Sequence, residues 1–314
     1  MLRIGIHTST SGSLERAALK AHELGANAFQ IFSASPRMWR ANAPDPAQVH
    51  LLKATRELYD LNPLVIHDSY LINLASADPT IRQKSIAAFT GEIERAIIIG
   101  ADFLVAHPGN YKDQTLEQGL LNVAEGLARA WHGVGQQLKS QARVAILLEN
   151  MAGAKNQIGG AFQDLATLRH LAQPYLDIAI GYCIDTCHCY VYGRDLSTEA
   201  GVCLTIQDIE EVLGLEHVHV IHCNDAKTAL GSRLDRHANI GAGYIGKEGF
   251  RRILGDQRLR EKAFILETPV DEPGDDLRNV TALKELSPFP NKRLTTRKSK
   301  ASGTSGGKTT RRST

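Results

Sequence analysis

Residues of the types that bind metal ions recur along this chain at a nearly regular interval. The six members of the series are His67, His107, Glu149, Asp185, His222 and Glu267, separated by 40, 42, 36, 37 and 45 residues. Three further residues of these types, His188, Asp235 and His237, follow members of the series closely. Nine ligands exceed the roughly four that one zinc ion takes, and they suit a cluster of two or three ions. Such clusters clamp the attacking and leaving oxygens of a phosphoryl displacement, so phosphodiester hydrolysis is the leading prediction.

The stretch CIDTCHC, residues 183–189, offers a competing interpretation, because its thiols are typical of a structural zinc site. The regular series, however, consists of imidazoles and carboxylates and takes only Asp185 and His188 from this stretch. We therefore expect Cys183, Cys187 and Cys189 to pack as small buried side chains rather than to bind metal.

Strands that alternate with helices are predicted to position these residues. The expected strands are Leu2–His7, Ala28–Phe32, Leu64–His67, Phe103–His107, Val144–Glu149, Ile178–Asp185, Val218–His222 and Ala263–Glu267. Amphipathic stretches lie between them, such as residues 13–25 with Ser13 as N-cap and residues 115–135 with Thr115 as N-cap. Eight strand–helix units predict a single-domain α/β protein with a closed (β/α)8 TIM barrel, whose active site lies at the carboxyl ends of the strands. An open doubly wound sheet is the alternative, although no glycine-rich phosphate-binding motif follows the first strand.

Composition and charge limit the remaining classes. The chain has 314 residues, of which 43% are hydrophobic and 22% charged, enough for a large core. We expect a barrel domain over residues 1–287 and a basic, disordered tail over residues 288–314, where eight Lys or Arg and no acid follow Pro290. Subtraction of that tail leaves 28 basic and 34 acidic residues, a net charge of −6. No apolar run approaches the roughly 20 residues of a membrane span. Five cysteines without a disulfide-type spacing or a leader favour reduced thiols and a cytoplasmic location.

Several blocks of sequence together resemble the endonuclease IV family of abasic-site endonucleases. They are IGIHTS (4–9), HDSYLINLAS (67–76), AHPG (106–109), LLENMAG (147–153), CIDTCHCYVYGRDL (183–196), IHCNDAK (221–227), GSRLDRHANIGAGYIG (231–246) and ILETP (265–269). The resemblance extends over residues 2–286 and implies a xylose-isomerase-like barrel. It departs from the family pattern at Met151, Ala154, Tyr190 and Tyr192, which affects the expected loop shape and substrate preference rather than the ligands.

The resemblance also implies three zinc ions per chain. The first ion would be held by His67, His107 and Glu149. Glu149 would bridge to the second ion, held also by Asp185, His222 and Glu267. The third would be held by His188, Asp235 and His237. Glu149, Glu267 and His188 are the residues expected to act in catalysis.

The implied reaction is hydrolysis on the 5′ side of an abasic site in duplex DNA, leaving a 3′-hydroxyl and a 5′-deoxyribose phosphate, by a monomer that acts in base excision repair. Arg37, Tyr70 and Leu71 match positions where the family inserts side chains into the base stack. Lys227 and His7 are expected to contact the DNA as well. An abasic nucleotide has lost stacking and pairing, so its extrusion costs less than that of an intact one.

Two other functions remain open at this point. A metal-dependent sugar isomerase or epimerase of the xylose-isomerase-like barrels would share this layout, but it needs only one or two metals and has no use for His188, Asp235 and His237 as a third set. A non-catalytic protein that binds damaged DNA is a further alternative. A complete ligand ring with open coordination positions argues against it, because a pure binding module does not need them.

Overall fold

Eight parallel strands form a closed barrel in the computed structural model, which describes residues 2–289. The barrel strands are β1 (Arg3–His7), β2 (Ala28–Phe32), β3 (Leu64–His67), β4 (Phe103–Ala106), β5 (Ala145–Glu149), β6 (Ile180–Asp185), β7 (Val218–His222) and β10 (Ala263–Leu266). Each strand pairs with its neighbours in chain order, and β10 closes the barrel against β1. The predicted (β/α)8 barrel is confirmed, and the closure excludes the open-sheet alternative. All eight expected strands are present; three have the expected bounds, and the ends of the other five differ by one or two residues.

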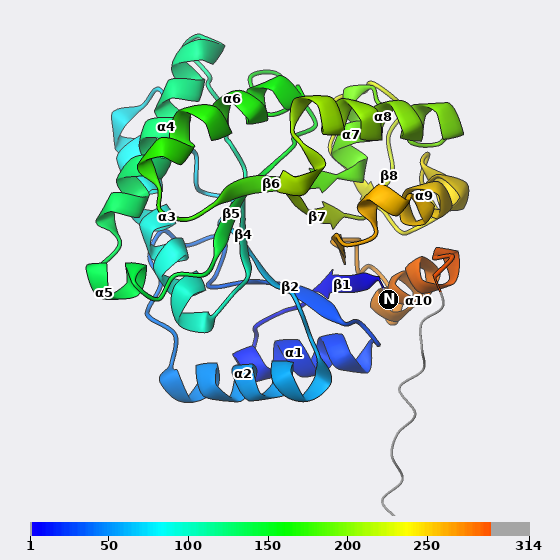
Figure 1. Cartoon of the computed structure of the whole chain (residues 1–314), viewed down its shortest axis with the longest axis horizontal. Helices are drawn as coiled ribbons and strands as arrows, with labels where there is room; N and C mark the ends of the chain where they lie inside the picture. Colours follow the sequence, from blue (N-terminus) through cyan, green and yellow to red (C-terminus); the bar gives the residue numbers. More distant parts are fainter. Residues whose placement is uncertain (1, 290–314) are drawn as a thin grey trace, which may run out of the picture.

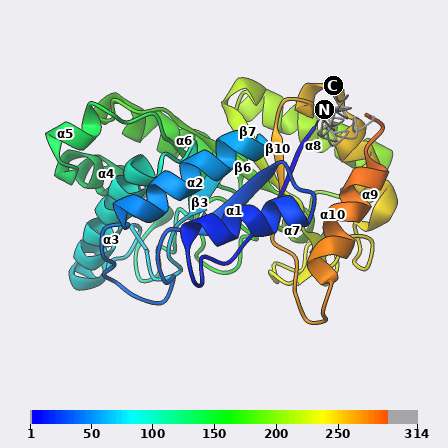
Figure 2. The ribbon, with the colours of Figure 1, turned by 90° about the horizontal axis from the view of Figure 1, so that it is seen from below.

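Helices surround the strands, as Figure 1 shows. They are α1 (Leu14–Glu23), α2 (Pro46–Tyr59), α3 (Pro79–Ile99), α4 (Leu116–Gly133), α5 (Gln136–Lys139), α6 (Phe162–Ala172), α7 (Thr186–Tyr192), α8 (Glu199–Val212), α9 (Gly246–Gly255) and α10 (Asp275–Leu286). The α1 and α2 helices pack side by side on one flank of the barrel (Figures 1 and 2). The expected caps are present, because the side chains of Ser13 and Thr115 accept hydrogen bonds from the backbone amides of Arg16 and Gln118.

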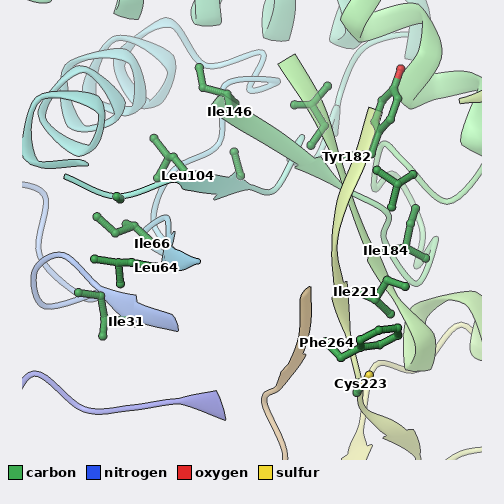
Figure 3. Packing of buried hydrophobic residues seen from close by; sticks show 14 of the residues in the cluster. Ile31, Leu64, Ile66, Leu104, Ile146, Tyr182, Ile184, Ile221, Cys223 and Phe264 are labelled. Atoms are coloured by element: carbon green, nitrogen blue, oxygen red, sulfur yellow. The ribbon is translucent and has the colours of Figure 1, made fainter. Parts of the chain in front are cut away.

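Strand residues divide between two apolar layers because successive side chains point to opposite faces of a strand. The outer layer, between strands and helices, includes Leu64, Ile66, Leu104, Ile146, Tyr182 and Phe264 (Figure 3). The inner layer contains Ala28, Val65, Val105, Leu147, Cys183, Val220, Ala263 and Ile265. Gly5 of β1 completes this inner layer, since a Cβ there would lie 2.6 Å from the carbonyl oxygen of Ala28. The barrel is therefore filled by side chains and has no central channel.

The inner layer determines which residues reach the carboxyl face of the barrel. Two positions beyond the last inner-layer residue, the next side chain of the same parity lies at or just past the strand end, except in β2, where Gln30 precedes the end at Phe32. Among residues 2–289, no helix combines the length and apolar character that crossing a bilayer requires. The predicted basic tail falls almost wholly on residues 290–314, outside the described residues, so that prediction and the domain boundary at 287 remain untested.

Candidate metal centre

The alternation of side chains along the barrel strands places the ligand series in one ring. Each member lies two residues beyond an inner-layer residue, as His67 follows Val65 and Glu149 follows Leu147. His107 and Glu267 lie one residue past the ends of β4 and β10, where the expected strands had included them. The ring is therefore a direct consequence of a two-residue period in strands whose carboxyl ends meet at one face.

The first group of ligands is built around one oxygen of Glu149. Its Oε2 lies 3.3 Å from Nε2 of His67 and 3.3 Å from Nε2 of His107. The ligand atoms of the three residues lie within 4.8 Å of one another. His67 and Glu149 are buried, whereas His107 is partly open to the cavity above them.

The second group uses the other oxygen of Glu149. Its Oε1 lies 3.2 Å from Nδ1 of His222, and the same nitrogen lies 3.2 Å from Oε2 of Glu267. Asp185 completes the group, whose ligand atoms also lie within 4.8 Å of one another. Because the two oxygens of Glu149 face different groups, this carboxylate has the geometry of a bridge between two ions.

The third group comes from outside the barrel strands. His188 Nε2 lies 3.2 Å from Oδ2 of Asp235, and His237 Nε2 lies 3.2 Å from Oδ1 of the same carboxylate. His188 lies in the α7 helix, whose N-cap is Asp185: Oδ1 of Asp185 accepts a hydrogen bond of 2.8 Å from the backbone amide of His188. His237 opens a two-stranded ribbon of β8 (Asp225–Ala226) and β9 (His237–Ala238). Asp185 also groups with His188 and His237, so it lies between the second and third groups.

Burial and imidazole–carboxylate pairing control the electrostatics of the centre. Burial by itself would raise the pKa of Glu149, but the neighbouring imidazoles, above all His222, outweigh it and hold that pKa well below its usual range. Burial would lower the pKa of His67, whereas Glu149 raises it to about 10. Likewise, Asp235 overcomes the effect of burial and raises the pKa of His237 to about 9. In the metal-free protein these imidazoles are therefore the cationic partners of the carboxylates at neutral pH.

This donor set fits a cluster of divalent cations. Within residues 2–289, no Lys or Arg forms an ion pair with Glu149, Asp185, Asp235 or Glu267, although the first two are almost completely buried. Buried carboxylates need positive charge nearby, and in the described part of the chain the imidazoles supply it. The Nε2 atoms of His188 and His237 are buried without a hydrogen-bond partner even though each lies close to Asp235. Once such a ring loses its proton, the same nitrogen presents a lone pair, as a metal ligand must.

The cysteines of CIDTCHC are buried free thiols, as expected. Burial, together with the nearby Asp185 carboxylate, raises the pKa of the Cys187 thiol well above its usual range, which keeps the thiol protonated. Cys183 lies near Glu149 and His222, and Cys187 near Asp235 and His237, close enough to belong to ligand groups. Protonated thiols are poor ligands, so the imidazoles and carboxylates remain the preferred set.

Buried amides that the sequence analysis missed hold the ligands in place. The Oδ1 of Asn150 accepts from the amide of Asp185 at 2.6 Å, and its carbonyl oxygen lies 2.8 Å from Nδ1 of His188. The Nδ2 of Asn224 donates to Oδ2 of Asp185 at 2.6 Å. A third amide, that of Gln30, contacts His222 and Glu267. Their signal in the sequence was position: Asn150 directly follows Glu149, and Gln30 lies two residues beyond Ala28.

A cavity of about 360 Å³ opens over the first and third groups and is lined by His7, Tyr70 and most of the ligands. A larger groove of about 980 Å³ continues from it past His7 to Arg16 and Lys20. The side chain of Tyr70 is 64% exposed at the rim, and Leu71 beside it is half-buried.

The remaining residues predicted to contact DNA lie on loops. Arg37 is exposed in the loop after β2, and Lys227 is exposed just after β8. Thus the nine predicted ligands converge, and the five predicted contact residues all lie on loops or strand ends of the same face.

Comparisons with known proteins agree in their outcome. A family model described as a xylose isomerase-like TIM barrel matches residues 18–286. The chain is 55% identical over 286 residues to a probable endonuclease 4 from Solibacter usitatus, covering 91% of this chain and 97% of that protein. It is 38% identical over 287 residues to a probable endonuclease 4 from Methanoculleus marisnigri, covering 91% and 99% of the two.

Solved structures give the same result. The endonuclease IV structure from Thermus thermophilus matches with a TM-score of 0.78 at 37% identity, covering 90% of this chain and 98% of that chain. A D-tagatose 3-epimerase-like protein matches with a TM-score of 0.67 at 19% identity, covering 91% and 97%. At that identity the second likeness concerns the fold alone.

Proposed function

The chain belongs to the endonuclease IV family, and on this premise we propose that it hydrolyses the phosphodiester bond 5′ to abasic sites in duplex DNA with three zinc ions. Its relatives identify it as an abasic-site endonuclease. The position of the cut, the identity of the metal and the roles of individual residues are what we propose. The observation that carries the proposal is the convergence of nine imidazoles and carboxylates at the carboxyl face of the barrel, where no Lys or Arg of residues 2–289 pairs with the carboxylates.

The residues divide the work according to their geometry. When bound, the ions supply an activated water near neutral pH and offset charge on the phosphoryl group. Glu149, whose two oxygens face different ligand groups, would hold the first two ions, and the partly exposed His107 would leave the first of them accessible. Asp185 groups both with the second set of ligands and with His188 and His237, so it would connect the sites of the second and third ions. Glu267 faces the cavity beside His7, where it can orient both an ion and the substrate phosphate.

Damage recognition is assigned to the two loops that border the cavity. Ser69 Oγ donates a hydrogen bond of 2.8 Å to the carbonyl oxygen of Pro36, which joins the loop of Arg37 to the loop of Tyr70. The ring of Tyr70 also packs edge-on against Phe32, with centroids 5.2 Å apart. Side chains held on a preformed base can fill the gap left by an extruded nucleotide without a large ordering cost.

Leu71, Lys227 and His7 are proposed as further contacts with the DNA. Leu71 adjoins Tyr70, Lys227 is an exposed cation on the ribbon side of the cavity, and His7 lines both the cavity and the groove. A monomeric state and a cytoplasmic location stay predictions. The sugar isomerase or epimerase alternative is not favoured, since the third ligand group and the Tyr70 loop have no function in it.

Cleavage of a labelled duplex that contains one abasic site tests the proposal. We expect incision on the 5′ side of the site, a 3′-hydroxyl product, no cut in the matched intact duplex, and close to three zinc ions per chain by elemental analysis. Glu267→Gln should abolish turnover, whereas Glu248→Gln, an exposed residue of α9, should not change it. Three bound zinc ions with no incision would refute the function, and incision without bound metal would refute the mechanism.

A further inference from the structure

Gln30 is a fully buried amide inside the ligand ring that none of the proposed roles uses. It lies in β2, two residues beyond Ala28 of the inner layer, which is the place that metal ligands take in six other strands. Its amide contacts three functional side chains at once. The Nε2 atom lies 2.5 Å from Oε1 of Glu267 and 3.1 Å from Nδ1 of His7, and Oε1 lies 2.9 Å from Nε2 of His222.

Only one orientation of this amide satisfies its neighbours. An ionised carboxylate only accepts hydrogen bonds, so the group that faces Glu267 must be the NH₂ of Gln30. The amide oxygen then faces His222, and His222 Nε2 must carry a proton in order to donate to it. That leaves the lone pair of a neutral His222 on Nδ1, the atom that faces Glu149 and Glu267 at 3.2 Å.

The NH₂ group of Gln30 has a second N–H, and the direction of this bond determines which ring nitrogen of His7 carries the proton. That hydrogen points to Nδ1 of His7, so Nδ1 accepts it and a neutral ring carries its own proton on Nε2. His7 lines the cavity together with Tyr70, so the ring is placed to act as a hydrogen-bond donor toward a substrate. Meanwhile Oε1 of Glu267 is engaged by Gln30, and Oε2 is the oxygen that remains for an ion.

We propose that Gln30 is a positioning residue that places one proton on Nε2 of His222, one on Nε2 of His7, and leaves one oxygen of Glu267 free for metal. The inference rests on the proposed function in that His222 and Glu267 hold the second ion. Groups that orient metal ligands in this way typically change metal affinity or activity by roughly 10- to 100-fold when removed.

Nitrogen-15 NMR of the histidine rings in zinc-loaded protein tests this directly, because it shows which ring nitrogen carries the proton. The wild type should show His7 and His222 protonated on Nε2. A proton on Nδ1 of His7, or on Nδ1 of His222, overturns the proposal before any variant is made. The NMR measurement does not depend on DNA cleavage. A failure of the proposed function can therefore be distinguished from a failure of this inference.

Two variants separate the contacts of the amide. Gln30→Leu removes all of them, whereas Gln30→Glu keeps an acceptor for His222 and can offer at most one O–H, shared with Glu267, in place of the two N–H groups. In Gln30→Glu we expect His222 to stay protonated on Nε2. In both variants we expect His7 to lose its preference for the Nε2-protonated form, so that a mixture of the two neutral forms appears. In Gln30→Leu, one zinc ion per chain should be lost to a competing chelator roughly 10- to 100-fold more readily.

Gln173→Leu is the matched control, since Gln173 makes three hydrogen bonds with backbone groups near the start of β6 and touches no ligand. It should leave both histidine patterns and zinc retention unchanged. If Gln30→Leu kept wild-type patterns and zinc retention, Gln30 would be only a packing residue and the proposal would be wrong. If Gln173→Leu lost zinc to the same extent, the loss would reflect general destabilisation, which also contradicts a specific role for Gln30.

Discussion

Zinc binding to the metal-free protein is expected to release protons from particular imidazoles. A metal ligand must present a lone pair, so a protonated ring has to lose its proton when the ion binds. The carboxylate neighbours raise the pKa of His67 to about 10 and that of His237 to about 9. Both rings are therefore almost fully protonated at pH 7.5, and each belongs to a different ligand group.

The size of the effect follows from these values. His67 and His237 together release about two protons per chain at pH 7.5, one for each of the two ions that they help to bind. The carboxylates add none, because the pKa of Glu267 is lowered to about 2 and that of Asp235 lies below its usual range. The apparent affinity for each of the two ions should rise about tenfold per pH unit up to about pH 9.

Titration calorimetry in buffers of different ionisation enthalpy measures the number of protons released. The observed enthalpy should change with buffer in proportion to at least about two protons per chain. His67→Asn should lower that number by about one. His22→Gln should leave it unchanged, because His22 stacks on Tyr59 away from the centre. An enthalpy that is independent of the buffer would refute the pairing of protonated imidazoles with carboxylates.

Three other predictions concern stability, recognition and the thiols. In metal-free protein, the raised pKa values of His67 and His237 add folding stability that is complete below about pH 6.5 and is lost as the pH rises through 9 to 10. The melting temperature of metal-free protein should therefore fall across that window, whereas that of zinc-loaded protein should not. Arg37→Ala and Tyr70→Ala should weaken binding to abasic duplex by roughly tenfold or more without loss of zinc, which gel-shift and elemental analysis would check; loss of zinc would contradict their assignment to recognition. Cys187→Ser should retain all zinc, and loss of an ion would instead indicate thiolate ligation.

The barrel and most of the centre could be predicted from sequence because both depend on local periodicity. Residues such as Val65 and His67 share a strand face, and the strand order follows the chain, so the inner layer and the ring above it can be derived without long-range information. The position of His67 at the end of a strand, and that of Arg37 in the loop after the preceding expected strand, could be predicted from this periodicity.

The features that escaped prediction depend on tertiary contacts. The α7 helix begins because the Asp185 side chain caps it, and a seven-residue segment has too weak a periodicity to show this. Gln30 is not a metal-ligand residue type, so its place beside His222 and Glu267 becomes evident only when β2 closes against its neighbours in three dimensions. The membership of Asp185 in two ligand groups likewise becomes evident only from the three-dimensional structure.

The amount of zinc at which activity appears tests the central claim most directly. Metal-free protein would be titrated with zinc, and single-turnover cleavage of a duplex with one abasic site would be measured at each step. The geometry of three linked ligand groups predicts that incision 5′ to the site rises to a plateau near about three zinc ions per chain. A plateau at one ion per chain, or three bound ions without incision, would contradict it.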